Sequence, residues 1–223
     1  KRKAEAFYGL PLQNGYGLTE STAGVCSTRN PIGSPDISAG FALPETEIRL
    51  DTSVGADGDP DAGEILTRGP QVMKGYFRNP EETARAIDAE GWLRTGDLGK
   101  IDKAGNLHVV GRCKELIIRG GFNVYPPEVE AALNDHPDVI QSAVIGNSVN
   151  GDEEILAFVQ CADPATLDRE ALVAFAAERL TGYKRPSRII LTTQLPAAPT
   201  GKILKHKLLS VFAEQLAQPA AEE

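Results

Sequence analysis

The first segment whose residues could do chemistry is the heptapeptide NGYGLTE at residues 14–20. Its two glycines let the backbone approach a ligand closely, and Tyr16 offers a flat aromatic face to a base. The side-chain oxygens of Thr19 and Glu20 could coordinate a cation. The segment is not a Rossmann fingerprint, because Glu20 stands where the last glycine is required. Taken alone, these residues are equally well interpreted as a glycine-rich turn that caps a helix.

A second candidate segment is WLRTGD at residues 92–97. Asp97 follows a glycine directly, at the start of an expected strand, and a carboxylate in that position can accept two hydrogen bonds from a ribose diol. An aspartate in an ordinary turn is the commoner interpretation of such a pattern.

The third segment, GRCKELIIRGGFN at residues 111–123, places Arg112 and Lys114 before an apolar strand that Gly120 and Gly121 interrupt. A domain linker with solvated charges explains this pattern equally well. The two basic neighbours of Cys113 could lower the pKa of its thiol, but charged neighbours alone do not make a nucleophile, and we interpret Cys113 as structural.

The fourth segment is PTGKILK at residues 199–205. We expect Lys202 near the N-terminus of the last helix, where the helix dipole disfavours a cation by roughly 0.3–1 kcal/mol. A lysine in that position indicates an anionic ligand, although an exposed surface lysine is the ordinary alternative. The segment is not a phosphate-binding P-loop, because Pro196 and Ile203 stand where that motif needs glycine and Ser or Thr.

The elements expected to carry these segments form two groups. In the first group, a helix ends at Gly9, a helix capped by Asn79 begins after it, and strands alternate apolar and polar residues. These strands are expected at residues 12–15, 45–50, 64–67, 98–101 and 107–110.

A second group begins near Arg112 and mixes strands with helices, which is typical of a compact α+β domain. We expect strands at residues 116–118, 139–145, 155–159 and 188–192, and helices at residues 127–134, 168–180 and 203–216.

Composition limits the possible partners. The chain of 223 residues is 41% hydrophobic and 24% charged, which is typical of a folded globular protein. A formal net charge of −8 argues against a nucleic-acid partner, and no apolar run is long enough to span a bilayer. Three widely spaced cysteines favour a reducing, cytoplasmic location, and the three histidines lack metal-ligand spacing. A homo-oligomer remains open.

In this order and spacing, the four segments resemble the adenylate-forming superfamily, which contains acyl-CoA synthetases, luciferases and peptide-synthetase adenylation domains. The resemblance covers nearly the whole chain, including GEI at residues 63–65, GP at 69–70 and GY at 75–76. The segments KELI at 114–117 and GGFNVYP at 120–126 are more similar to CoA ligases than to peptide-synthetase domains.

The resemblance implies a two-step reaction with ATP, Mg²⁺ and coenzyme A. A substrate carboxylate attacks the α-phosphate of ATP to form acyl-AMP and pyrophosphate, and the CoA thiol then displaces AMP. The resemblance further assigns Tyr16 and Gly17 to adenine, Thr19 to phosphate and Glu20 to Mg²⁺. Asp97 and Arg112 would bind the ribose hydroxyls.

Two further roles follow from the resemblance in the second half of the chain. Lys202 would bridge the substrate carboxylate and the phosphate. Lys114 would be the hinge about which the small domain swings, so that the Gly120-Gly121 loop replaces Lys202 and helps to form the CoA channel.

The implied fold is α+β: residues 1–111 would be the β-rich C-terminal part of the large domain, a distorted barrel, and residues 112–223 a small α+β lid domain. The family's Gly/Ser/Thr-rich phosphate loop lies upstream of NGYGLTE, so we expect a fragment that binds nucleotide weakly and does not complete adenylation.

Three alternatives stay open at this stage. One is an adenylation domain that loads a carrier protein, and another is a binding module for AMP or CoA without catalysis. The third is a regulatory addition to any of them, in which acetylation of Lys202 removes its charge.

Overall fold

The computed structural model describes residues 1–54 and 59–217, and it divides into two compact units, Lys1–Lys114 and Glu115–Glu223. The boundary that the sequence predicts after residue 111 falls at the end of strand β7 (Leu107–Arg112), just before this division. Each unit has hydrophobic clusters of its own, as expected of elements that fold around separate cores.

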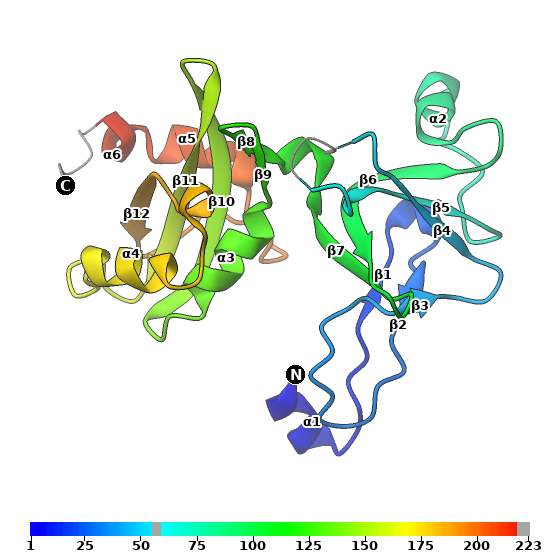
Figure 1. The fold of residues 1–223 in the computed structure, drawn as a ribbon, viewed down its shortest axis with the longest axis horizontal. Coiled ribbons are helices and arrows are strands. Elements are labelled where there is room, and N and C mark those ends of the chain that lie inside the picture. The colour runs from blue at the N-terminus through cyan, green and yellow to red at the C-terminus, as the bar shows by residue number, and fades with distance from the viewer. Residues whose placement is uncertain (55–58, 218–223) are drawn as a thin grey trace. The chain divides into compact units, whose positions relative to one another are not determined.

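The first unit contains two antiparallel sheets (Figure 1). The larger one has the strand order β4-β5-β6-β7, and the smaller one has the order β1-β2-β3. The strands of the larger sheet are β4 (Glu47–Asp51), β5 (Gly63–Arg68), β6 (Leu93–Ile101) and β7, and those of the smaller are β1 (Gly15–Tyr16), β2 (Cys26–Ser27) and β3 (Phe41–Ala42).

The two sheets are joined at Leu107, which forms an isolated antiparallel bridge with Gly40. Cys26, Ala39, Ile65 and Leu107 are buried in the shared core of this unit. Among the described residues the sheets do not close into a barrel, because β4 and β7 end the larger sheet and β7 meets the smaller sheet through the bridge at Leu107. The distorted barrel that the resemblance implies is therefore present here only as two bridged open sheets.

Short helices flank these sheets. Helix α1 (Arg2–Tyr8) ends at Gly9, as the sequence predicts, and Gly9 adopts the left-handed conformation with φ of 63°. Helix α2 (Pro80–Ala86) begins after Asn79, whose side chain accepts a hydrogen bond from the backbone N–H of Glu82. The predicted cap is thereby confirmed. A 3₁₀ turn, η1 (Thr19–Ser21), follows β1.

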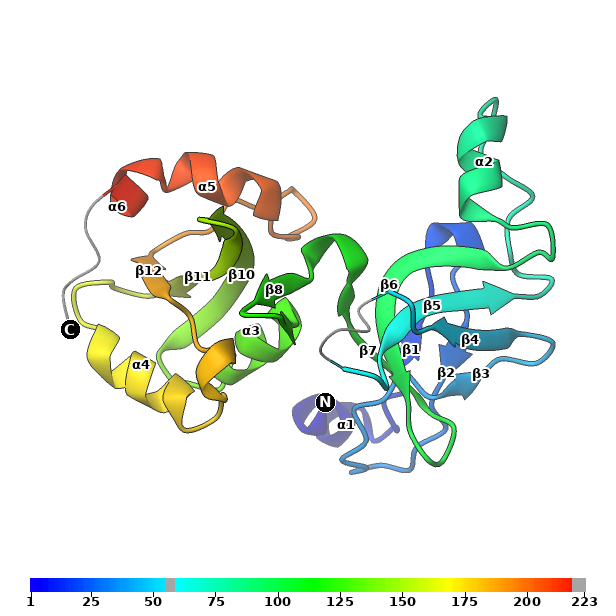
Figure 2. The same ribbon diagram turned by 45° about the horizontal axis from the view of Figure 1, so that its top comes forward.

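The second unit is a three-stranded sheet covered on both faces (Figure 2). Helices α3 and α4 lie on one face, and α5 and α6 lie on the other. Strand β11 runs antiparallel to β10 and parallel to β12. The elements are β10 (Val139–Val149), β11 (Asp152–Cys161), β12 (Arg188–Thr192), α3 (Pro126–Asn134), α4 (Arg169–Ala177), α5 (Leu208–Val211) and α6 (Ala213–Ala217).

Strand alternation explains the two covered faces. Along β11, Ile155, Ala157 and Val159 pack with α3 and α4, whereas Leu156 and Phe158 pack with Leu208 and Phe212 on the opposite face. Because consecutive side chains of a strand point to opposite faces, an uninterrupted apolar run marks a strand that is buried on both sides.

Three elements differ from the expectations. The strand expected at residues 12–15 is instead the two-residue strand β1, and a hairpin of β8 (Ile117–Arg119) and β9 (Phe122–Val124) surrounds the two glycines. The helix expected at residues 203–216 is broken into η4 (Lys205–Lys207), α5 and α6.

The last helix starts late because its predicted first residues pair with an upstream segment. Ile203 forms an antiparallel bridge with Ala197, and the N–H of Ala198 donates to the carbonyl of Lys202 at 2.8 Å. Lys202 therefore lies in a tight turn before any helix begins. The expectation that it opposes a helix dipole was wrong.

No helix in the described part of the chain combines the length and the apolar composition that a membrane span requires.

Candidate functional site

One buried carboxylate joins three of the predicted ligand-binding residues. The hydroxyl of Tyr16 donates to Oδ2 of Asp97 at 2.7 Å, and Nε of Arg112 lies 3.1 Å from Oδ1 of the same carboxylate. These residues come from β1, β6 and β7, and Asp97 is the direct antiparallel partner of Arg112. The tertiary fold thus unites side chains that are up to 96 positions apart, since 112 − 16 = 96.

The electrostatics of this cluster differ from one member to the next. Asp97 is 7% exposed, whereas the Arg112 side chain is 57% exposed. Burial raises the pKa of Tyr16 well above the usual tyrosine range, and its hydrogen bond to Asp97 adds to this effect. Tyr16 is therefore a neutral hydroxyl donor at physiological pH. The arrangement presents a carboxylate acceptor beside an exposed guanidinium, a combination that can bind vicinal hydroxyls.

Tyr16 also lines a cavity of about 530 Å³, which is in the usual size range for a small-molecule site. Gly17, Gly24 and Leu43 contribute to the same wall. A Cβ atom on Gly17 would lie 1.9 Å from the carbonyl oxygen of Ala23, so the turn closes only around glycine. The glycine pattern of NGYGLTE therefore reflects a close approach of two backbone segments.

Thr19 and Glu20 lie in the 3₁₀ turn after β1. Thr19 is exposed, and the half-buried Glu20 accepts a hydrogen bond at Oε1 from the hydroxyl of Tyr76 at 3.0 Å. The backbone carbonyl of Glu20 accepts from the N–H of Met73 at 2.8 Å. Across residues 1–54 and 59–217, no group of three or more His, Cys, Asp and Glu side chains could hold a metal ion. A cation at Glu20 would therefore have at most two such side chains of the described residues as ligands, and its other ligands would come from elsewhere.

Cys113 and Lys114 lie in the 3₁₀ turn η2 (Cys113–Glu115), where the first unit ends. Burial raises the pKa of the Cys113 thiol to about 11, and the nearby Glu64 carboxylate adds to the shift. The thiol is protonated at neutral pH, which agrees with the structural interpretation of Cys113. Lys114 is exposed and is the last residue of its unit.

Gly120 and Gly121 form the two-residue turn between β8 and β9. Their φ angles are +57° and +80°, and two consecutive positive values are typical of a type I′ hairpin turn. The N–H of Gly120 donates to Oδ1 of Asp152 at 2.8 Å. The glycines thus shape a hairpin tip in the second unit.

Lys202 is exposed on the turn that precedes η4. Three residues later, Nζ of Lys205 lies 2.8 Å from a carboxylate oxygen of Glu115 and 2.8 Å from one of Glu130. Burial alone would lower the pKa of Lys205, but its hydrogen bonds to Glu115 and Glu130 outweigh burial and raise it. Lys205 is a fixed cation at the base of the segment whose exposed turn presents Lys202.

The structure thus brings together Tyr16, Asp97 and Arg112 around one carboxylate, and it places Gly17 beside Tyr16 in the cavity wall. Thr19 and Glu20 belong to the same unit, whereas Gly120, Gly121 and Lys202 belong to the other.

Sequence reasoning missed Tyr76 as the partner of Glu20 and Lys205 as the partner of two glutamates. The only sequence signal for each was its presence in a segment already noted, GY at residues 75–76 and PTGKILK at 199–205.

Two family sequence models match the chain. Residues 1–77 match the AMP-binding enzyme, and residues 128–202 match the AMP-binding enzyme C-terminal domain. The long-chain-fatty-acid–CoA ligase of Bacillus subtilis is 41% identical over 222 residues, which cover 96% of this chain and 39% of the relative.

Solved structures agree with these matches. The O-succinylbenzoate coenzyme A synthetase of Bacillus subtilis, in complex with ATP and magnesium ion, superposes with a TM-score of 0.81 and 32% identity. Amide bond synthetase McbA of Marinactinospora thermotolerans superposes with a TM-score of 0.81 and 35% identity. These alignments cover 93% and 95% of this chain and 43% of each relative, so the chain spans about two fifths of the length of these proteins. The chain belongs to the AMP-binding, or adenylate-forming, enzyme family and carries the family's C-terminal domain.

Proposed function

We propose that the protein acts as an ATP-dependent acyl-CoA synthetase. In the first half-reaction, a carboxylate oxygen of the substrate bonds to the α-phosphorus of ATP, and the bond to the bridging oxygen breaks to release pyrophosphate. In the second, the thiol sulfur of coenzyme A bonds to the acyl carbon, the thiol gives up its proton, and AMP leaves.

The observation that carries this proposal is the cluster of Tyr16, Asp97 and Arg112 next to the open hollow that Tyr16 lines. In our assignment the Asp97 carboxylate accepts hydrogen bonds from the ribose hydroxyls and Arg112 donates to them, while Tyr16 flanks adenine. Gly17 keeps the turn close enough for its backbone to lie against the nucleotide.

Thr19 and Glu20 are the proposed contacts to phosphate and Mg²⁺. A single carboxylate suits Mg²⁺, because this ion keeps several waters and is commonly held by one or two carboxylates together with substrate phosphates. The bound ion would supply charge neutralisation to the phosphates. The hydrogen bond from Tyr76 restricts the Glu20 side chain, so that one oxygen is oriented by protein and the other is available to a ligand.

Lys202 is the proposed catalytic cation. Carboxylate and triphosphate repel each other, and the compact charge of a lysine ammonium stabilises the negative charge where it develops. The exposed turn around Lys202 supports this role, because an ammonium there is available to an anionic ligand.

The proposed hinge is Lys114, and the division of the chain between Lys114 and Glu115 supports it. The Gly120-Gly121 hairpin is the proposed contact of the lid domain, residues 112–223, with the pantetheine channel. Its two positive φ angles mean that added side chains would strain the turn.

The acceptor is CoA in this proposal, and the substrate is a small-molecule carboxylate. The similarity to proteins named as CoA ligases or synthetases supports this acceptor, and the similarity to amide bond synthetase McbA makes an amine the alternative to test. A carrier-bound thiol is the third outcome. Three cysteines free of disulfides in the described residues support a cytoplasmic location.

The test is carboxylate-dependent exchange of labelled pyrophosphate into ATP, with a panel of aliphatic and aromatic acids. It is run on this chain and on a protein extended by the family's upstream phosphate-loop segment. We expect exchange only in the extended protein, and then thioester formation when CoA is added. AMP binding without exchange by either protein would overturn the proposal in favour of a binding module.

A further inference from the structure

A bulge in β6 determines where the Asp97 side chain points. Glu64 is paired with Leu98 and Leu66 with Arg94, so one residue of β5 faces three residues of β6. The three residues are Thr95, Gly96 and Asp97, and Gly96 has φ of +72°. Bulges of this kind redirect a side chain and leave backbone groups without ladder partners.

Side chains take the place of the missing ladder partners. The N–H of Gly96 donates to Oε1 of Glu64 at 3.1 Å, and the N–H of Asp97 donates to Oγ1 of Thr95 at 3.1 Å. The hydroxyl of Thr95 in turn donates to the carbonyl of Ile65 at 2.8 Å. The bulge is therefore closed by one carboxylate and one hydroxyl.

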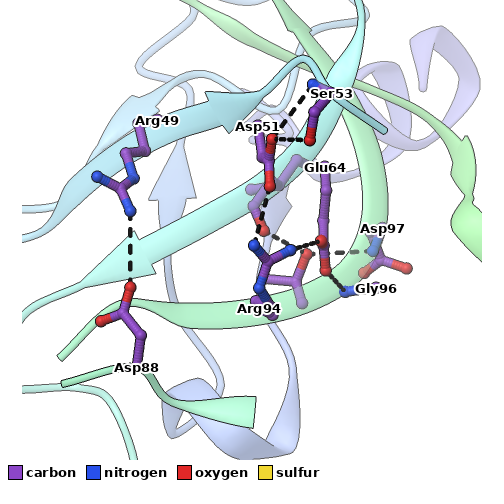
Figure 3. Close-up of polar contacts among 10 residues, drawn as sticks. Arg49, Asp51, Ser53, Glu64, Asp88, Arg94, Gly96 and Asp97 are labelled. Atoms are coloured by element: carbon purple, nitrogen blue, oxygen red, sulfur yellow. Dashed lines mark hydrogen bonds and ion pairs between the residues drawn. The ribbon is translucent and has the colours of Figure 1, made fainter. Parts of the chain in front are cut away.

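Glu64 is itself held in place from its other side (Figure 3). Its Oε2 accepts from a guanidinium nitrogen of Arg94 at 2.6 Å, and Arg94 also donates to Oδ2 of Asp51 at 2.9 Å. Figure 3 shows Arg94 between the two carboxylates, with Ser53 capping Asp51. Glu64 is only 7% exposed, and a buried carboxylate with both oxygens engaged has one well-defined orientation.

We infer that Glu64 is a positioning residue for nucleotide binding. Its carboxylate fixes the backbone at Gly96 and thereby holds Asp97 where it meets Tyr16, Arg112 and a ribose diol. This inference rests on the proposed function of Asp97 as the ribose acceptor. Glu64 makes no contact with the nucleotide in this account and acts through the bulge.

The test compares the affinities of AMP and 2′,3′-dideoxy-AMP, measured by amide chemical-shift titration of the chain. The variants are Glu64→Ala, Glu64→Gln and Asp97→Ala. The control is Glu47→Gln, which removes a carboxylate paired with Arg68 on the same sheet but away from the bulge. The wild-type chain should prefer AMP by about tenfold or more, the usual effect of a hydrogen bond to a charged group.

We expect Glu64→Ala to reduce this preference to within about twofold, mainly because the affinity for AMP falls while the affinity for the dideoxy analogue changes little. Glu64→Gln keeps an oxygen for the Gly96 N–H but presents an amide to Arg94, and should give an intermediate preference. Glu47→Gln should leave the preference unchanged. If Glu64→Ala does not fold, the preference of Glu64→Gln decides.

The outcomes separate the inference from the function on which it rests. The ribose assignment itself fails if the wild-type chain shows no preference for AMP over the dideoxy analogue. It also fails if Asp97→Ala keeps the wild-type preference. If Asp97→Ala abolishes the preference but the Glu64 variants retain it, only the positioning role of Glu64 is refuted. An equal loss of affinity for both nucleotides in the Glu64 variants would show a general structural role instead.

Discussion

The Asp97 cluster and the Lys202 turn differ in how far their charged groups are exposed to solvent. Asp97 is buried, and its two oxygens already contact Tyr16 and Arg112. Lys202 is exposed at the tip of a turn closed by backbone hydrogen bonds, and Lys205, three residues later, is held by Glu115 and Glu130.

This difference matches the two kinds of work that the proposal requires. A group that recognises the ribose acts throughout the reaction, so preorganisation within one unit reduces the entropy that binding costs. A cation needed in only one half-reaction must be able to leave, so it belongs on an exposed turn with a rigid base. Four predictions test this contrast.

The largest expected effect is on catalysis by Lys202. In the extended protein, Lys202→Ala should lower kcat for pyrophosphate exchange by about 100- to 1,000-fold, because it removes charge stabilisation in the transition state. The KM for ATP should change little. Steady-state kinetics of Lys202→Ala beside Lys207→Ala, a neighbouring exposed lysine, measure this. A rise in KM with unchanged kcat would place Lys202 with the binding groups instead.

A smaller effect is expected for Gly17→Ala, which should lower the free energy of unfolding by about 1–3 kcal/mol. The new methyl group would lie 1.9 Å from the carbonyl of Ala23, so the turn must open and the cavity wall must shift. Urea unfolding followed by the fluorescence of Trp92 in the same unit reports the change. Gly182→Ala in the second unit, where no atom lies within 4 Å of the added carbon, is the control; followed by amide signals from β10 and β11 of its own unit, it should be nearly neutral.

Lys205→Met should destabilise the second unit by about 1–2 kcal/mol, because it leaves Glu115 and Glu130 without their shared cation. Adding Glu115→Gln to this variant should recover part of the loss. Amide signals from β10 and β11 during urea unfolding give the measurement. A rigid base for Lys202 is not supported if the single variant is as stable as the wild-type chain.

The smallest effect concerns Tyr16. Its folded pKa is raised, mainly by burial, so its contribution to stability is fully present below about pH 10 and falls as the pH rises further. Ultraviolet titration of phenolate absorbance should show a late-ionising tyrosine that Tyr16→Phe removes. An unchanged titration curve in that variant would mean that the hydroxyl is not buried against Asp97.

Several elements followed from local sequence alone. Gly9 and Asn79 end and begin their helices as their residue types predict, because each needs only its own turn of backbone. Strands β5, β11 and β12 were likewise predicted from apolar runs and from the alternation of apolar and polar residues. The prediction of a helix at 203–216 was wrong at its start because residues 197 and 203 pair with each other. Helix propensity, a local property, does not predict such pairing.

By itself, the sequence determined the family, through four short segments in a fixed order, and it determined which residue types were available for nucleotide chemistry. Only the tertiary structure decided that Tyr16 and Arg112 share the carboxylate of Asp97, and that Glu64 closes the bulge that aims it. The physical reason is that these contacts join strands distant in the chain. Their geometry depends on sheet register and on a bulge with two extra residues in β6, neither of which any local pattern encodes.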